Sequence, residues 1–402
     1  MENNLKIPSG SKLGSEFSFH LPTRIVFGSG TLQNIGEQTR RLGSKAFLVT
    51  AKDTMREMGI LDQVVQNLRE EGVVFEIYED VEPDPSTDTI NQGAAVLRSF
   101  KADLVLGLGG GSAIDAAKGM AVAATHPCED IWDYIIGGNP GSEAIGPETL
   151  PILAIPTTSG TGTETTMGSV IRNLSLGSKE CLGSEYIAPA LAIVDPDLSR
   201  SMPQDLTAAT GLDALTQCIE AFVSVRSNPL SDALALHGIR LISKYLRVAV
   251  HHGDNLEARS ALSLGAMISG MALSQAGVGA AHAISMVLGG RYGVQHGLGV
   301  SLFLADTIQF NAQSSPEKYA LVAEAMGESI EGCTPGEAAE LAVSAIHSLV
   351  HDVGLGGKLR DFAIPLSDLQ EVSEAIVRHP DMGPNPAKLS ANDVYQMLVD
   401  KH

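Results

Sequence analysis

Four side chains of types that commonly bind metal ions stand in three segments of the second half of the chain. Asp213 and Gln217 are four residues apart in the segment GLDALTQC, so a helix would present both on one face. His282 stands in a second small-residue segment, AHAISM, and His296 follows fourteen residues later in GVQHG. One carboxylate, one amide oxygen and two imidazoles can surround a divalent cation and leave a coordination position open. The spacing therefore predicts a metal site, provided that these segments converge.

The chemistry of such a site follows from its charge. A single carboxylate leaves the cation with net positive charge, so the cation binds an alcohol oxygen, lowers its pKa and polarises a carbonyl group in the reverse direction. Asp213, His282 and His296 would then act in catalysis through the metal, while the alcohol carbon gives a hydride to a nicotinamide. The alternative is that each histidine is a hydrogen-bonded core residue, and spacing alone does not separate the two interpretations.

A glycine-rich segment at residues 109–118, GGGSAIDAAK, follows an apolar run and is expected to begin a helix. Consecutive glycines let the backbone turn sharply and approach a ligand closely. Ser112 and Asp115 are expected to form a capping box at the start of that helix. The free N–H groups and the positive end of the helix dipole can bind a pyrophosphate without any basic side chain. The alternative is a turn without a ligand, since the pattern is not GxGxxG.

A second loop, PTTSGTGTE at residues 156–164, also follows an apolar run. Its threonine and serine hydroxyls can hydrogen-bond the ribose or the amide of a nicotinamide cofactor. A solvated turn is the alternative interpretation. Together the two loops predict that a dinucleotide lies along one edge of the fold.

Apolar β-rich runs alternate with helical segments through the first half of the chain. Strands are predicted at residues 24–28, 46–50, 73–78, 103–108, 150–155 and 191–194, with helices around 61–71 and 88–100. This alternation is typical of a parallel sheet covered by helices on both faces. Beyond Asp195 and Pro196 the apolar residues recur at helical spacing. We predict a Rossmann-like α/β dinucleotide-binding domain over residues 1–203 and an all-α metal- and substrate-binding domain over 204–402, with the ligands in the crevice between.

The composition excludes several classes of protein. The 402 residues include 47 acidic and 27 basic side chains, which gives a net charge of −20. Such a chain is repelled by nucleic acids and by anionic membranes, so we expect a small-molecule partner, no nucleic acid and no membrane. Residues 1–17 lack the apolar core of a signal peptide, which predicts a cytoplasmic protein. Four scattered cysteines indicate neither a disulfide framework nor a zinc knuckle.

Several of these motifs, taken in order, resemble those of the iron-type, group III alcohol dehydrogenases, a family related to glycerol dehydrogenase and dehydroquinate synthase. The resemblance covers nearly the whole chain. It rests on FGSG at Phe27, GGGSAIDAAK, PTTSGTGTE, Lys179 ten residues before Pro189, VDP at Val194, GLDALT at Gly211, His282 and QHG at Gln295. It implies that NAD(P) and a divalent metal, Fe²⁺ before Zn²⁺, meet in the interdomain cleft. It also implies a small alcohol or aldehyde as substrate and a homodimer or larger homo-oligomer.

The resemblance also implies roles for individual residues. Gly110, Gly111 and Ser112 match positions that hold the pyrophosphate, and Asp84 matches a position near the adenosine. Thr157, Thr158, Lys179 and Leu198 match positions that line the ribose and the nicotinamide. Asp213, His282 and His296 match the metal ligands. The full set predicted to bind the cofactor is Ala51, Asp53, Asp84, Gly110, Gly111, Ser112, Asp115, Thr157, Thr158, Lys179 and Leu198.

Three positions depart from the family pattern. Gln217 stands where a histidine is common, and its amide oxygen is a weaker and harder donor, which bears on the identity and affinity of the metal. Met286 replaces a further histidine near the nicotinamide, so no proton relay passes through it. Ala51 replaces an acidic residue that favours NAD, and Lys52 could attract a 2′-phosphate, while Asp53 lies close enough to restore the NAD preference. We therefore expect NAD(H), with NADP(H) as the alternative.

The sequence thus predicts an oxidoreductase that interconverts an alcohol and an aldehyde or ketone by hydride transfer to or from NAD(P). A metal-independent reductase or a lyase like dehydroquinate synthase would use the same scaffold. A nucleotide-binding assembly protein is the non-enzymatic alternative.

Overall fold

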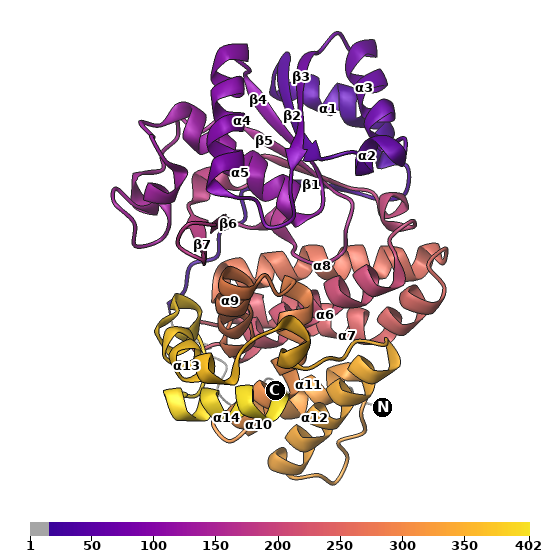
Figure 1. Ribbon diagram of the computed structural model, residues 1–402. Coiled ribbons are helices and arrows are strands. Elements are labelled where there is room, and N and C mark those ends of the chain that lie inside the picture. The colour runs from indigo at the N-terminus through magenta and orange to yellow at the C-terminus, as the bar shows by residue number, and fades with distance from the viewer. Residues whose placement is uncertain (1–15) are drawn as a thin grey trace.

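The first half of the chain builds a six-stranded sheet in which every pair of neighbouring strands is parallel (Figure 1). The computed structural model describes residues 16–402. The strands, in sheet order, are β1 (Arg24–Phe27), β8 (Leu191–Val194), β5 (Ile152–Pro156), β4 (Leu104–Gly109), β2 (Lys45–Ala51) and β3 (Val74–Val81). All six strands predicted from the sequence are present, which confirms the expected parallel sheet.

Helices cover both faces of this sheet because alternate side chains of its strands point to opposite sides. On β2, Phe47 and Val49 join one buried cluster with the helices α4 (Thr87–Phe100) and α5 (Gly111–Thr125). Leu48, between them, joins the opposite cluster with α1 (Ile35–Leu42) and α3 (Ile60–Glu70). A four-residue helix, α2 (Thr54–Glu57), follows β2. Figure 1 shows the two helical layers on either side of the strands.

The order of the strands creates a crevice at one edge of the sheet. The chain passes from β2 outward to β3 and then returns to place β4 on the other side of β2. Ligands of open α/β sheets bind at the carboxyl ends of the strands next to such a reversal. The loops that leave β4 at Gly109 and β5 at Pro156 both begin at this edge.

A two-stranded antiparallel hairpin, β6 (Gly168–Asn173) and β7 (Ser178–Gly183), was absent from the sequence prediction. It lies between α5 of the sheet region and α9 of the helical region (Figure 1). Polar and charged residues interrupt both strands, among them Arg172 and Lys179, which are directly opposite each other. Because so little of each strand is apolar, the local pattern resembles a loop, and packing between the two halves makes it a hairpin.

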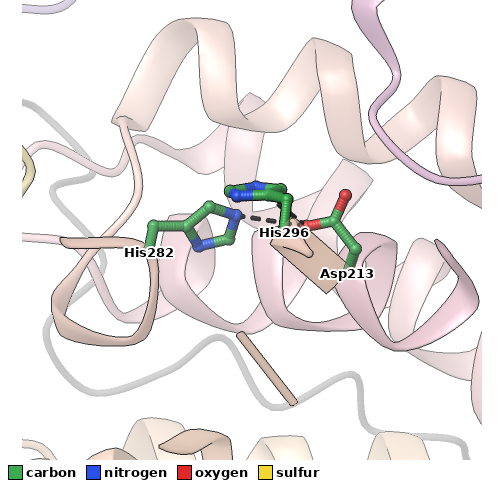
Figure 2. Close-up of side chains that lie close together, drawn as sticks. All are labelled: Asp213, His282 and His296. Atoms are coloured by element: carbon green, nitrogen blue, oxygen red, sulfur yellow. Dashed lines mark ion pairs between the residues drawn. The ribbon is translucent and has the colours of Figure 1, made fainter. Parts of the chain in front are cut away.

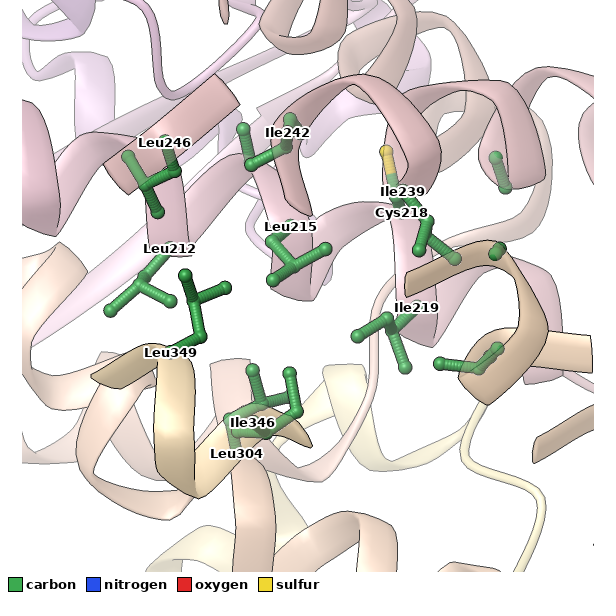
Figure 3. Close-up of a cluster of buried hydrophobic side chains, with 14 of the residues drawn as sticks. Leu212, Leu215, Cys218, Ile219, Ile239, Ile242, Leu246, Leu304, Ile346 and Leu349 are labelled. Carbon is green, nitrogen blue, oxygen red and sulfur yellow. The ribbon is translucent and has the colours of Figure 1, made fainter. Parts of the chain in front are cut away.

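The second half of the chain is helical, as predicted. Its helices are α6 (Gln204–Val223), α7 (Pro229–His251), α8 (Leu256–Ala276), α9 (Ala280–Tyr292), α10 (His296–Asn311), α11 (Pro316–Met326), α12 (Pro335–Asp352), α13 (Leu369–Arg378) and α14 (Ala391–Lys401). Helix α6 lies at the centre and is buried along most of its length. Leu215 of α6, Ile242 of α7 and Ile346 of α12 meet in the main core (Figure 3).

The bend between α8 and α9 matters for the site, because it sets the direction of the helix that carries His282. The two helices turn by 100° at a break that includes Gly277, whose φ of +74° is unfavourable for other residues. Among residues 16–402, no single helix has the length and apolar composition to cross a membrane, and only this bent pair passes the test when taken together. The prediction that the N-terminal segment is not a signal peptide rests mainly on residues 1–15, which lie outside the described part of the chain.

Candidate active site

Three of the four predicted metal ligands converge from three different helices. Asp213 comes from the middle of α6, His282 from the first turn of α9 and His296 from the first position of α10 (Figure 2). One potential ligand atom from each lies within 4.8 Å of the others. Asp213 Oδ1 is 3.4 Å from His282 Nε2 and 3.6 Å from His296 Nε2. These separations leave a common centre that a single cation can share.

Two of the converging atoms have no hydrogen-bond partner among residues 16–402. They are Asp213 Oδ1 and His282 Nε2, and both are buried. Buried polar atoms are normally hydrogen-bonded, so two unpaired atoms that face one point indicate a missing partner between them. Burial alone would lower the pKa of His282, but the carboxylates of Glu220 and Asp213 raise it to about 10. The pocket therefore stabilises a positive charge at this place.

Glu220, which the sequence analysis did not select, fixes the orientation of His282. His282 Nδ1 donates to Glu220 Oε2 at 2.6 Å, and the same carboxylate accepts the backbone N–H groups of Gly279 and Ala281 at 2.8 Å each. With Nδ1 held by Glu220, Nε2 faces Asp213 and the common centre, where a bound cation would displace the Nε2 proton and take its lone pair. Glu220 follows Asp213 by seven residues, two helical turns along the same face, and that spacing was a signal in the sequence.

Ser285 orients His296 in a similar way. Its hydroxyl donates to the backbone carbonyl of His296 at 2.9 Å and lies 3.1 Å from His296 Nδ1. The hydroxyl oxygen can therefore accept the Nδ1 proton, which leaves the Nε2 lone pair on the side of Asp213. Burial lowers the pKa of His296 to about 4 against the opposing effect of Asp213, so the ring is neutral and able to act as a ligand.

Gln217, the fourth predicted ligand, is buried one turn beyond Asp213, but its side chain contacts α8. Ser269 Oγ lies 2.6 Å from Gln217 Oε1 and 2.7 Å from the carbonyl oxygen of Ala266. A hydroxyl has one hydrogen and cannot donate to both oxygens. If the amide is turned over, its nitrogen donates to Ser269 Oγ, Ser269 donates to Ala266, and Oε1 faces away from α8. The structure thus brings three of the predicted ligands together. Whether the oxygen of the fourth, Gln217, faces away from α8 depends on the rotation of its amide group.

The start of α5 differs from the predicted capping box, and that prediction was wrong. Gly110 is the residue before the helix, and no side chain caps the first turn. Ser112 Oγ instead accepts the backbone N–H of Asp84 at 3.1 Å. Asp115 is buried and accepts hydrogen bonds from Thr163 Oγ1 at 2.6 Å and the Val170 N–H at 3.1 Å. Because Asp115 faces the core, it does not cap the first turn of α5, whose free N–H groups stay available for an anion.

The two loops that were predicted to bind the cofactor contact each other at the glycines. A Cβ atom placed on Gly111 would lie 2.6 Å from Thr161 Cγ2, and one on Gly110 would lie 3.2 Å from Thr158 Cγ2. Thr157 joins the loops by donating its N–H to the carbonyl oxygen of Gly109 at 2.9 Å. Contact within the protein therefore excludes a Cβ at Gly111 unless the loops move, and it crowds one at Gly110.

The remaining residues that were predicted to bind the cofactor are an ion pair, two residues at the edge of the sheet and one residue of the core. Asp84 and Lys179 form an ion pair with 2.5 Å between Oδ1 and Nζ, and although burial opposes it, Lys179 keeps the pKa of Asp84 below its usual value. Ala51 ends β2 and Asp53 precedes α2, so both stand at the carboxyl edge of the sheet. Leu198 is buried in the core cluster beneath that edge.

Lys118 and the FGSG and VDP motifs have structural partners. Lys118 is fully buried, and its ammonium donates to oxygens of Thr163, Thr166 and Gly168 at 2.7–3.0 Å. Asp195 of VDP accepts the N–H groups of Gly30 and Leu32, which follow Phe27. These contacts hold the second loop and the first strand in place.

Comparison with known families identifies the whole arrangement. The family model "iron-containing alcohol dehydrogenase" matches residues 22–196, and the model of the C-terminal part of the same family matches residues 207–401. The chain belongs to the iron-containing alcohol dehydrogenase family. Members of this family interconvert alcohols and aldehydes, and the chain is an oxidoreductase of this kind that uses NAD(P) and iron or another divalent metal.

Individual members of the iron-containing alcohol dehydrogenase family match almost end to end. The chain is 36% identical over 380 residues to the 1,3-propanediol dehydrogenase of Klebsiella pneumoniae, a match that covers 94% of this chain and 97% of the other. It is 39% identical over 362 residues to the long-chain-alcohol dehydrogenase 1 of Geobacillus thermodenitrificans, which covers 88% and 90%. The crystal structure of an archaeal alcohol dehydrogenase from a Red Sea brine pool superimposes with a TM-score of 0.92 at 31% identity and covers 96% of this chain and 99% of that one.

Proposed function

We propose that this alcohol dehydrogenase holds its divalent metal, preferably Fe²⁺ and otherwise Zn²⁺, through Asp213, His282 and His296. The observation that carries the proposal is the pair of buried, unpartnered atoms, Asp213 Oδ1 and His282 Nε2, that face one centre. When bound, the metal supplies a positive charge that lowers the pKa of an alcohol oxygen and polarises a carbonyl group.

The protein's own residues position this chemistry. Glu220 and Ser285 hold the two imidazoles with their Nε2 lone pairs toward Asp213. Little water reaches Asp213 and His282, since both are almost completely buried. Charge that develops on a substrate oxygen is therefore stabilised in a pocket of low dielectric.

Gln217 is proposed as a fourth ligand in the rotated form of its amide. The supporting observation is the hydroxyl of Ser269, whose single hydrogen cannot serve both the Ala266 carbonyl and Gln217 Oε1, a conflict that the rotated amide removes because its nitrogen donates to Ser269 Oγ. The amide oxygen then points away from α8 and is free to bind the metal.

The dinucleotide is proposed to bind along the carboxyl edge of the sheet, with its pyrophosphate at Gly110, Gly111 and Ser112. The uncapped start of α5 supports this placement. Thr157, Thr158, Lys179 and Leu198 are assigned to the ribose and nicotinamide, and Asp84 to the adenosine side. Asp115 has its side chain committed to Thr163 and Val170, so its proposed part is to hold the loop.

NAD(H) is proposed as the preferred cofactor over NADP(H). Asp53 is exposed at the carboxyl edge of the sheet, two residues after Ala51, where its charge disfavours a 2′-phosphate. Comparison of kcat/KM for the two cofactors tests this preference, and a higher value with NADP(H) would contradict it.

Three further features complete the proposal. The chain is divided at residue 203 into a dinucleotide-binding domain and a metal- and substrate-binding domain. It forms a homodimer or a larger homo-oligomer. It is located in the cytoplasm. The exposed strand β1 at one edge of the sheet is the surface that favours self-association. Light scattering of the purified protein tests the oligomer, and cell fractionation tests the location.

The decisive experiment is Asp213→Asn, which keeps the shape of the side chain. The variant is expected to lose its metal and its turnover, by at least about a thousandfold, while NADH binding measured by fluorescence is unchanged. Asp205→Asn, in the exposed first turn of the same helix, is the control. Full turnover in metal-free protein would support the metal-independent reductase instead. A product formed without net change in the nicotinamide would indicate a lyase, and NADH binding without any turnover would indicate an assembly protein.

A further inference from the structure

Two residues that are assigned to opposite halves of the dinucleotide form an ion pair with each other. Asp84, which the proposed function places on the adenosine side, has its Oδ1 2.5 Å from Nζ of Lys179, which is assigned to the ribose and the nicotinamide. The pyrophosphate is the part of a dinucleotide that joins these two halves. The ion pair therefore lies where the proposed function expects the pyrophosphate.

Ser112 indicates the same position independently. Its hydroxyl accepts the backbone N–H of Asp84 at 3.1 Å. Ser112 is also the second residue of α5, whose uncapped first turn is the proposed phosphate site. The loop that carries Asp84 is thus fixed against the start of this helix. The ammonium group that pairs with Asp84 is therefore within reach of an anion bound there.

Lys179 depends on Asp84 for its counter-charge. Its side chain is only 3% exposed, and a buried ammonium group without a partner is strongly unfavourable. Asp84 is the one carboxylate among residues 16–402 that forms an ion pair with it. Burial opposes the ionisation of Asp84, but the charges of Lys179 and of Arg172, which is directly opposite Lys179 in the hairpin, keep its pKa below the usual value. Asp84 is therefore negatively charged at neutral pH.

We propose that Asp84 is a positioning residue that competes with the pyrophosphate for Lys179 and so speeds the release of the dinucleotide. The carboxylate keeps the lysine ordered before the cofactor binds, and a bound phosphate oxygen must then share the ammonium group with it. Sharing weakens the binding of NADH. Because product release limits kcat in many enzymes, a faster release favours turnover. This inference rests on the proposed function, which places the pyrophosphate at the start of α5.

Asp84→Asn tests the competition, because it removes the charge and keeps the shape of the side chain. Asparagine also tolerates the φ of +53° at this position. We expect the dissociation constant of NADH, measured by fluorescence, to fall by about tenfold, with a slower release in stopped-flow experiments. A residue that only stabilised the loop would give equal or weaker binding when replaced, and either result would overturn the proposal. Asp80→Asn, at an exposed position of β3, is the matched control.

If the asparagine variant does not fold, Asp84→Gly repeats the measurement, since glycine also lacks the charge and adopts the same φ. Lys179→Met then assigns the effect to the pair. It should weaken NADH binding, and Asp84→Asn added to it should no longer tighten binding, because no ammonium group is left to compete for. Tighter binding in the double variant than in Lys179→Met would show that the carboxylate acts on the pyrophosphate directly, and the competition for Lys179 would be wrong.

Gly111→Ala, at the proposed phosphate site, separates this inference from the proposed function. If Asp84→Asn and Lys179→Met leave NADH binding unchanged while Gly111→Ala weakens it, the ion pair does not act on the cofactor. The inference is then wrong, and the placement of the pyrophosphate stands. If all three variants bind NADH as the wild type does, the placement of the pyrophosphate at the start of α5 is wrong as well.

Discussion

Glu220 and His282 form a buried pair in which the imidazole Nδ1 donates to the carboxylate at 2.6 Å. The same carboxylate holds the first backbone N–H groups of α9, so one side chain of α6 fixes both the ring and the helix that carries it. Through this pair the orientation of a proposed metal ligand depends on a residue that does not touch the metal.

Glu220→Gln is therefore expected to weaken metal binding by about 10- to 100-fold, because an amide holds the Nδ1 proton less strongly than a carboxylate does. Metal affinity is measured by competition with a chelator, and NADH binding should be unchanged. Glu324→Gln on the exposed side of α11 is the control. Equal metal affinity in the wild type and Glu220→Gln would show that the pair only stabilises the fold.

Ser269→Ala tests whether Gln217 presents its oxygen to the metal. Loss of the hydroxyl frees the amide to rotate, so we expect metal affinity to fall by about tenfold. Gln217→His should tighten metal binding and make it insensitive to Ser269→Ala, since imidazole needs no such orientation. Ser274→Ala, on the same helix, removes a hydroxyl that has no hydrogen-bond partner among the described residues and is the control. If Gln217→Ala binds metal as the wild type does, Gln217 is not a ligand.

Gly111→Ala tests the contact between the two loops of the proposed dinucleotide site. The added Cβ would lie 2.6 Å from Thr161 Cγ2, so the loops must move apart and the dissociation constant of NADH should rise by about tenfold or more. Thr161→Ala in the same chain removes the contacted atoms and should restore part of the affinity. Gly336→Ala, which has open space around its Cβ position, should leave binding unchanged. An unaltered dissociation constant in Gly111→Ala would show that the loops separate at little cost.

Glu164 gives the stability a dependence on pH. Burial raises the pKa of Glu164 to about 7 from an ordinary value of 4.5, so the folded state holds a proton that the unfolded state has lost between these two values. Its contribution is fully present below pH 4.5 and disappears as the pH rises through 7. Glu164→Gln imitates the protonated form, and its stability relative to the wild type should increase by about 2 to 3 kcal/mol between pH 5 and pH 8.

Urea unfolding of both proteins at pH 5 and pH 8 measures this difference. Glu324→Gln, in an exposed position, should show the same difference from the wild type at both values. A constant difference for Glu164→Gln as well would contradict the assignment of the titration to this carboxyl group.

The sequence by itself determined the fold class and the family. The apolar runs that became β2 and β4 are long and continuous, which only a buried parallel strand or a core helix tolerates, and their alternation with helices left one architecture. The three residues that converge, Asp213, His282 and His296, were also selected from the sequence, because their residue types are rare on otherwise apolar helices and their motifs occur in the family's order. The sequence also showed that Gln217 and Met286 stand at positions where the family pattern has histidine.

The tertiary structure alone decided how these residues are held. The partner of His282 is 62 residues away at Glu220, and the partner of Gln217 is 52 residues away at Ser269, so no local pattern relates them. Asp115 followed the spacing of a capping box, yet its carboxylate is hydrogen-bonded to Thr163 and Val170, because the loop after β5 and strand β6 bring these groups to it only when they pack against α5. Periodicity reports which side of a helix is buried, whereas the partner that each buried polar atom meets depends on how distant segments pack.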